Sequence, residues 1–176
     1  MPVLKSNKSI ADMAADIIRD AGGRVVGRTR LQKMAYLLEI CGLGSGFSFE
    51  YRHYGPFSEE LANAIVSAQI TDLITEEERT ALWGGSYSIF KATSESGNPD
   101  VNAARKRILE LGKEANPISL ELAATAAFLA IEGERDPWEE TKRRKPEKAD
   151  KWLSKARVLY SALKSVGGTP QGLPEI

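Results

Sequence analysis

The sequence predicts a mainly helical α+β domain with a small β-hairpin and a helical C-terminal part. Apolar residues recur at helical spacing along most of the 176 residues, and two short apolar segments flank a Gly-Gly pair, as the strands of a hairpin do. With 42% hydrophobic and 27% charged residues, the chain has the composition of a folded globule that closes its core without disulfides or metal.

Helical periodicity is clear in the first helix, which is expected over residues 9–21. Ile10, Met13 and Ile17 fall on one stripe, and Ser9 is the expected N-cap. The segment 120–131 is apolar nearly all round, which is typical of a helix at the centre of a core. The other expected helices cover residues 30–41, 58–68, 101–111, 136–142 and 146–166, and Ser119 is the expected N-cap of the central helix.

Short strands are expected between the helices. Phe47, Phe49 and Tyr51 alternate with polar residues, which is the period of a half-buried strand. Two or three short helices followed by a two-stranded hairpin form the outline of a winged helix, so the hairpin is expected to be winged-helix-like. Residues 25–26, 73–74 and 87–90 are the other expected strands, and residues 54–58 are an expected turn.

The chain is expected to form one domain from two packed parts, residues 1–97 and residues 98–168. A loop at residues 94–100, which contains Ser, Gly, Asn and Pro, separates the two parts. Residues 169–176 contain two prolines and are expected to be a flexible tail.

Charge and cysteine content restrict the function classes. The chain has 24 Lys and Arg and 24 Asp and Glu residues, whereas a dedicated nucleic-acid binder usually carries a basic excess. Cys41 is the only cysteine, which excludes an internal disulfide and fits a reducing compartment. The N-terminus lacks the apolar segment of a signal peptide, and no apolar run is long enough to span a bilayer. We therefore expect a cytoplasmic protein without a membrane partner.

Two linked motifs carry a resemblance to a known family. Residues 27–38 read Gly-Arg-Thr-Arg-Leu-Gln-Lys-Met-Ala-Tyr-Leu-Leu, and residues 49–58 read Phe-Glu-Tyr-Arg-His-Tyr-Gly-Pro-Phe-Ser. The first resembles the Lys-Leu-Gln-Lys helix, and the second the Tyr-Gly-Pro turn, of the Panacea family, also called SocA-like or DUF4065 domains, with the related YwgA-type proteins. The resemblance covers about residues 10–97, whose end loosely matches the family's Thr-x-x-Gly. The chain departs from the commoner pattern at Met34-Ala35 and in the charged segment 132–151.

This resemblance implies that the chain binds another protein. Panacea domains are similar to antitoxins that neutralise partner toxins, and SocA-like members act as adaptors that present a toxin to a protease. The chain is accordingly expected to be a non-catalytic antitoxin or adaptor, whose partner is a protein such as a toxin encoded nearby. The expected partner-binding residues are Arg28, Arg30, Gln32, Lys33, His53, Tyr54, Gly55, Pro56, Phe57 and Ser58.

The same residues also have a purely structural interpretation. The Tyr-Gly-Pro run fixes a turn, because glycine supplies conformational freedom and proline fixes φ. Gln32 and Lys33 are polar positions on an otherwise apolar helix, and they either anchor this turn or face a partner.

Catalysis and metal binding are not expected. His53 is the only histidine, and together with Cys41 it leaves too few ligands for an ordinary metal site. The spacing of these two residues does not indicate a nucleophile and its base, and the glycines at 42, 44 and 46 follow a helix and lack the rest of a phosphate-binding motif. No catalytic residue, metal or cofactor is therefore assigned, and an enzyme is the least expected class.

DNA binding is the alternative function. Arg24, Arg28, Arg30 and Lys33 surround the start of the second helix, where a winged helix meets phosphates. A second basic run at residues 142–148 is flanked by acidic residues, as a solvated helix face is. The three tryptophans, Trp83, Trp138 and Trp152, fit either the core or an interface.

Overall fold

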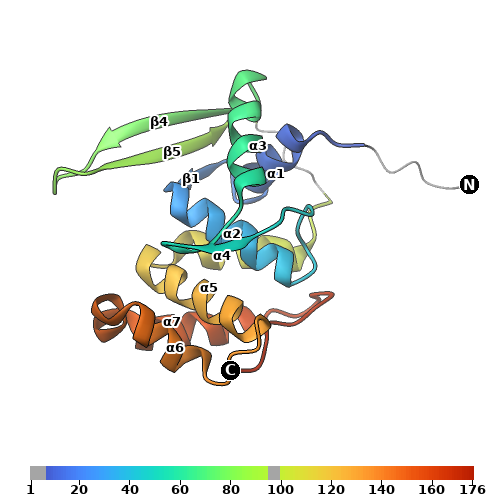
Figure 1. Cartoon of the computed structure of the whole chain (residues 1–176). Helices are drawn as coiled ribbons and strands as arrows, with labels where there is room; N and C mark the ends of the chain where they lie inside the picture. The colour runs from blue at the N-terminus through green and yellow to red at the C-terminus, as the bar shows by residue number, and fades with distance from the viewer. Residues whose placement is uncertain (1–6, 95–99) are drawn as a thin grey trace, which may run out of the picture.

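The computed structural model describes residues 7–94 and 100–176, and it has an α+β fold, as the sequence predicts (Figure 1). The expected boundary loop at residues 94–100 falls mostly on residues 95–99, which lie outside the described residues. The elements are α1 (Ile10–Asp20), β1 (Arg24–Val26), α2 (Arg28–Ile40), β2 (Glu50–Arg52), β3 (Gly55–Phe57), α3 (Glu59–Ile70), β4 (Ile74–Thr80), β5 (Ser86–Ala92), α4 (Ala103–Glu114), α5 (Pro117–Ile131), α6 (Pro137–Arg144) and α7 (Pro146–Lys164).

The larger sheet consists of β1, β5 and β4, in that order and all antiparallel. β4 and β5 pair from Ile74 and Ala92 at the base to Thr80 and Ser86 at the far end. Both strands are longer than the expected pieces at 73–74 and 87–90, and the hairpin extends away from the helices (Figure 1). β1 pairs only with the base of β5, so the outer half of the hairpin is a two-stranded ribbon.

A second, smaller hairpin corrects one expectation from the sequence. Residues 55–57, which the sequence placed in a turn, form β3 and pair with β2. Gly55 has a φ of +90°, and a Cβ at this position would lie 2.5 Å from the Oγ1 atom of Thr125. Only glycine fits there, because an L side chain would strain the backbone and collide with α5. The close approach of this hairpin to α5 therefore depends on Gly55.

The centre of the molecule is formed by α2 and α5. Every residue of α2 from Leu31 to Leu38 is buried, and α5 is buried on nearly all sides between α2, β3, α6 and α7 (Figure 1). The prediction of a central helix at 120–131 is confirmed. Its expected N-cap was wrong: Asn116 caps α5 by accepting hydrogen bonds from the backbone of Ile118 and Ser119, with Pro117 at the first helical position.

Residues 169–176, which the sequence predicts to be a flexible tail, contact α7 and the end of α2. The side chain of Leu173 is buried, and Tyr160 donates a hydrogen bond to the carbonyl of Pro174 over 2.6 Å. The backbone N–H of Gln171 donates to the carbonyl of Cys41, at the end of α2. The buried side chain of Leu173 and two hydrogen bonds thus connect this segment to the helices. The two prolines of the segment do not by themselves indicate these contacts.

The three tryptophans lie in different environments. Trp138 is buried on α6, where it stands edge to face against Tyr160 at a centroid distance of 5.5 Å. Trp152 is half-buried against the core, and Trp83 is 80% exposed in the turn between β4 and β5.

In the described part of the chain, no helix combines the length and apolarity that crossing a membrane requires.

Gly112 sets the distance between α2 and α4, and this contact gives a stability prediction. A Cβ at Gly112 would lie 2.7 Å from the Cγ atom of Met34, which is fully buried. Gly112→Ala is expected to lower the free energy of unfolding by about 1–3 kcal/mol through overpacking. Urea unfolding measures this change, with Gly167→Ala as the control because nothing lies within 4 Å of its Cβ position. Equal stability of the two variants would contradict the close contact.

Candidate functional site

The two motifs that the sequence singled out meet inside the molecule. The Nε2 of Gln32 on α2 donates to the carbonyl of Ser58 over 3.0 Å, and its Oε1 accepts from the N–H of Ser58 over 2.8 Å. Ser58 in turn caps α3, because its hydroxyl accepts from the N–H of Leu61. All three residues are buried. One glutamine therefore fixes the point where β3 ends and α3 begins.

Lys33 provides the second link between the motifs. Its side chain is 1% exposed, and its Nζ donates to the carbonyl of Pro56 on β3 over 2.7 Å. Burial lowers the pKa of Lys33 to about 8, against the attraction of Glu121, which raises it, and the repulsion of Lys145 and Lys148, which lowers it further. Lys33 thus holds β3 against α2 through this hydrogen bond.

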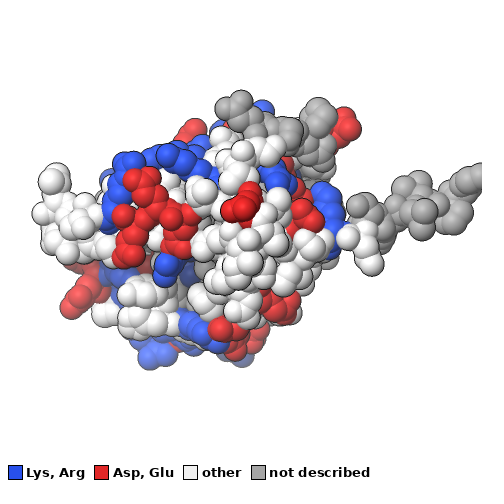
Figure 2. All heavy atoms as spheres, turned by 90° about the horizontal axis from the view of Figure 1, so that it is seen from above, with Lys and Arg blue, Asp and Glu red and all other residues white. Residues whose placement is uncertain are grey.

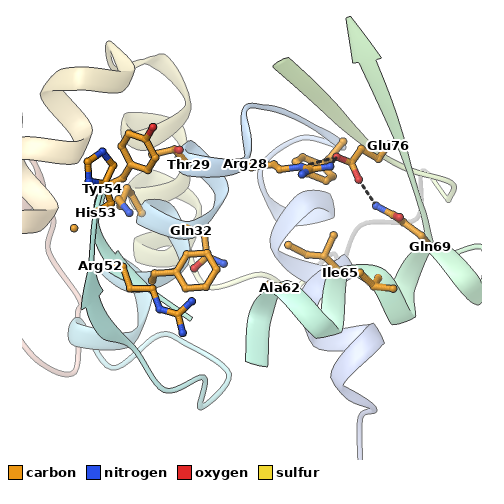
Figure 3. A pocket seen from close by; sticks show the side chains of 15 residues that line it. Arg28, Thr29, Gln32, Arg52, His53, Tyr54, Ala62, Ile65, Gln69 and Glu76 are labelled. Carbon is orange, nitrogen blue, oxygen red and sulfur yellow. Dashed lines mark hydrogen bonds and ion pairs between the residues drawn. The ribbon is translucent and has the colours of Figure 1, made fainter. Parts of the chain in front are cut away.

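A groove lies between α3 and the β2–β3 hairpin, above the first half of α2. Its cavity volume is about 460 Å³, within the range of roughly 300–1,000 Å³ that is usual for ligand pockets. Figure 3 shows Arg52, His53 and Tyr54 on the hairpin side and Ala62 and Ile65 on the α3 side. Val66, Phe57 and Phe90 add to the apolar lining, and Gln32 and Lys33 also line the groove.

One end of the groove is closed by a network around Glu76 on β4. Its carboxylate accepts hydrogen bonds from Arg28 at the start of α2 and from Gln69 on α3 (Figure 3). It also accepts a hydrogen bond from the hydroxyl of Ser88 on β5. Burial by itself raises the pKa of Glu76, but the hydrogen bonds from Ser88, Arg28 and Gln69 outweigh it, and the pKa is lowered. Glu76, the first of three consecutive glutamates, thus ties the base of the hairpin to both helices.

Large apolar side chains are exposed on α3 and at the tip of the β4–β5 hairpin. Val66 and Ile70 on α3 are 52% and 76% exposed, and Leu82 and Trp83 at the tip are fully or largely exposed. Seen from above, the tip forms an uncharged left edge of the molecule, with Asp and Glu side chains gathered beside it over the hairpin (Figure 2). The sequence predicts the hairpin as one part of the contact surface, and Trp83 fits either the core or an interface, but none of these four residues is individually predicted to bind a partner. The available signal was an apolar Leu-Trp pair directly before Gly84-Gly85, where turns are usually polar.

The structure separates the predicted site residues into an inner and an outer group. Gln32, Lys33, Gly55, Pro56 and Ser58 are buried, and Gln32, Lys33 and Gly55 line the groove. Phe57 is half-buried on the groove wall, whereas Arg28, His53 and Tyr54 are exposed on its rim. The inner group holds the hairpin and α3 in place, and the outer group presents exposed side chains.

The basic residues near the start of α2 are also divided. Arg30 donates from Nη1 to the carbonyls of Gly112, Lys113 and Ala115, at distances of 2.7, 3.1 and 2.6 Å. It therefore satisfies the C-terminal end of α4, where a cation is favourable. Arg28 is paired with Glu76 and Lys33 is buried, which leaves Arg24 as the member of the predicted DNA-binding set whose exposed side chain has no such internal role.

A buried ion cluster joins the C-terminal helices to the hairpin. Glu121 on α5 is 4% exposed and accepts from Lys145 and Lys148 over 2.7 and 2.9 Å. Lys145 also donates to the carbonyl of His53, between β2 and β3. This cluster was missed from the sequence, although a glutamate in an apolar helix was a signal that it has a buried partner.

The two groups considered for catalysis lie in unlike environments. Cys41 is buried at the end of α2, and burial raises the pKa of its thiol to about 11, so the thiolate is disfavoured. His53 is exposed at the tip of the β2–β3 hairpin, where its ring packs against Tyr54. Within residues 7–94 and 100–176, no group of three or more His, Cys, Asp or Glu side chains is placed to hold a metal ion.

The role of Gln32 as an anchor gives a second prediction. Gln32→Ala is expected to lower the free energy of unfolding by about 3 kcal/mol, because the buried N–H and C=O of Ser58 both lose their partner. Urea unfolding followed by circular dichroism measures the loss. Gln171→Ala, which truncates an exposed glutamine, is the matched control and should leave stability unchanged. If Gln32→Ala lowers the free energy of unfolding by no more than an ordinary surface substitution does, the N–H and C=O of Ser58 have found other partners and the prediction is wrong.

Lys33 gives a prediction about pH. Its pKa is about 8 in the folded chain and 10.5 when unperturbed, so between these values the unfolded chain binds a proton that the folded chain has released. Stability from this group therefore rises with pH across that window, by up to about 1.4 kcal/mol per pH unit. Lys33→Met removes the rise, and the measured quantity is the difference in unfolding free energy between wild type and variant from pH 8 upward. Parallel pH profiles would contradict the prediction.

That difference isolates Lys33 from the other perturbed groups. Burial raises the pKa of Cys41, Tyr36 and Tyr160, so each of these groups makes stability fall as pH rises through its unfolded value. Both proteins contain all three groups, and their contribution cancels.

No protein-family model matches the chain, and a search against curated proteins finds no match. A proposal of function therefore rests on the geometry of the groove and the hairpins.

Proposed function

We propose that the chain is a non-catalytic protein-binding domain that acts as an antitoxin or as a proteolytic adaptor. The observation that carries this proposal is the exposure of Leu82 and Trp83 at the end of a projecting hairpin (Figure 1). Tryptophan is enriched among the residues that dominate protein–protein binding energy, and large exposed apolar groups mark interaction surfaces. A partner that covers this tip removes both side chains from water.

The hairpin is built to present its tip in a defined position. The Glu76 network holds its base against α2 and α3, and β1 pairs with β5 next to it. At the tip, the ring of Trp83 lies against the backbone of Gly85, where a Cβ would overlap with the ring. A side chain that is already placed loses little conformational entropy on binding, which favours affinity.

The charges of the same region favour a protein over DNA as the partner. With the β2–β3 hairpin inserted after α2, the order α1, β1, α2, α3, β4, β5 and the pairing of β1 with β5 support a winged-helix-like description in which α3 is the helix that would enter a DNA groove. α3 contains no Lys or Arg, and it begins with two glutamates. Such a helix offers no cation to a phosphate backbone. The carboxylates of Glu76 and Glu77 on β4 are paired with Arg28 and Arg79, so they do not decide between the two kinds of partner.

The resemblance to Panacea domains supports the same proposal. The two motifs behind it are joined by the bonds from Gln32 to Ser58 and from Lys33 to Pro56, so they form one structural unit. This unit sets the wall of the groove and the start of α3. By occluding a partner's active surface, or by presenting the partner to a protease, such a domain acts without a reaction centre of its own.

The test is affinity purification from the native host, followed by mass spectrometry, of the wild type and of a Leu82→Ala, Trp83→Ala double variant. The wild type is expected to recover a specific protein, and the double variant to weaken its binding by a factor of roughly 30 or more, as loss of a hot spot of about 2 kcal/mol does. If the partner inhibits growth, co-expression with the wild type, and not with the variant, restores growth.

The matched control is Val158→Ala, which truncates another exposed apolar side chain, 71% exposed on α7. It should leave both recovery and growth rescue intact, and thermal unfolding checks that all variants fold. Loss of partner binding in Val158→Ala as well, or binding that the tip variant does not affect, would contradict the role of the hairpin. Salt-sensitive binding of duplex DNA that is reduced by Arg24→Ala, which truncates an exposed basic side chain, would favour the DNA-binding alternative.

A further inference from the structure

A second cavity adjoins the groove and differs from it in charge. This basic pocket is lined by the β2–β3 hairpin and by residues at the junction of α6 and α7. It shares Arg52 and His53 with the groove, so the two cavities meet at the hairpin tip. The residues that line it are Tyr51, Arg52, His53, Arg144, Lys145, Pro146, Glu147 and Lys148.

In the basic pocket, the cationic side chains are more exposed to solvent than the carboxylates that pair with them. Lys148 has a side chain 35% exposed, whereas its partner Glu121 is 5% exposed. Arg144 is likewise 35% exposed and pairs with Glu140, which is 14% exposed. Each of the two carboxylates is also shared, Glu121 with Lys145 and Glu140 with Arg143. The surface that a ligand meets on this side is therefore positive, although the chain as a whole is neutral.

Aromatic rings hold these cations in position. The guanidinium of Arg144 lies 4.9 Å from the ring centroid of Tyr51, and the Nζ of Lys148 lies 4.9 Å from that of Tyr54. Arg52, at the boundary with the groove, pairs with the exposed carboxylates of Glu50 and Glu59 and packs over Phe57. The positive groups are thus placed before any ligand arrives.

We propose that the groove and the basic pocket together bind one acidic peptide segment of the partner protein. Apolar side chains of the segment enter the groove between α3 and the hairpin, and Asp or Glu residues beside them pair with Arg144 and Lys148. This inference rests on the proposed function, which it extends from the hairpin tip to the groove and to the chemistry of the partner.

Two features favour a peptide over a nucleic acid in this site. The groove wall is apolar, with Ala62, Ile65 and Val66 contributed by α3, and apolar walls bury side chains but offer nothing to a phosphate backbone. The positive groups open to a ligand cover only a short stretch, because Glu59 at the start of the same helix is paired with Arg52, which leaves Arg144 and Lys148. A ligand that spans both cavities needs an apolar part and a short anionic part, as an acidic peptide has.

The experiment is a display selection of random linear peptides on the full chain, followed by fluorescence anisotropy with the labelled consensus peptide. The selected peptides are expected to combine bulky apolar residues with Asp or Glu. Arg144→Gln with Lys148→Gln, and separately Val66→Gln, are each expected to weaken binding of that peptide roughly tenfold, a change of about 1.4 kcal/mol. Raising the salt concentration should weaken binding to the wild type more than to the charge variant.

The matched control variants make the same kinds of substitution outside the proposed site. Lys151→Gln with Lys155→Gln removes two charges from α7, and Val158→Gln removes an exposed valine from the same helix. Neither control is expected to alter peptide binding, and circular dichroism melting confirms that every variant is folded. Equal losses in controls and site variants, or selected peptides without acidic residues, would overturn the proposal.

Two further outcomes separate this inference from the proposed function. If a labelled DNA duplex binds and the Arg144 and Lys148 variant abolishes that binding, the basic pocket serves nucleic acid and the peptide proposal is wrong. If the native partner still requires Trp83 but binds equally well to the Arg144 and Lys148 variant, the protein-binding function stands and the groove proposal fails.

Discussion

The hydrogen bond from the ammonium group of Lys33 to the carbonyl of Pro56 is the constraint on which the candidate site depends. An ammonium group that is 1% exposed has lost most of its hydration, and such a loss is strongly unfavourable unless polar partners replace the water. Pro56 supplies one partner directly, and the charge of Glu121 favours the protonated form from nearby. Displacement of the β2–β3 hairpin would leave the ammonium group of Lys33 without its acceptor. The position of the hairpin is therefore fixed by the stability of this hydrogen bond. Gln32, which is uncharged, constrains the end of the hairpin in the same way, through its two hydrogen bonds with the backbone of Ser58.

A second buried charge extends this constraint to the C-terminal helices. Glu121 on α5 pairs with Lys145 and Lys148, and Lys145 reaches the carbonyl of His53. The hairpin is thus fixed from α2 by Lys33 and from the start of α7 by Lys145. Removing one member of such a cluster leaves an uncompensated buried charge, so its members depend on one another. Both cavities have the hairpin as their common wall, and their shape follows from these polar links.

Local sequence signals predicted those parts of the fold that depend on neighbours along the chain. Ser9 is an N-cap as expected, and the apolar segment 120–131 is the central helix. The N-cap of α5 was misplaced because Asn116-Pro117 offers a cap and a first helical residue just before Ser119. Interactions between distant residues left weaker traces: Lys145 lies in a basic run, and nothing next to it shows that its partner is Glu121, 24 residues away. The inward direction of Glu76 depends on which face of β4 packs against the helices, which only the tertiary structure decides.

In the proposed binding function, the residues that anchor the hairpin differ from the exposed residues that contact a partner, and stability favours this separation. A polar side chain that anchors a hairpin must be shielded from water, because an exposed anchor exchanges its bond with the backbone for bonds with solvent. Gln32 and Lys33 satisfy that demand, since both are buried although they line the groove. In the proposed function, contact falls mainly to side chains that the fold leaves exposed, such as Trp83 at the tip and Lys148 at the basic pocket. A substitution at Trp83 leaves the buried anchors in place, whereas one at Lys148 also removes a partner of Glu121, so the two surfaces differ in how far they are coupled to the scaffold.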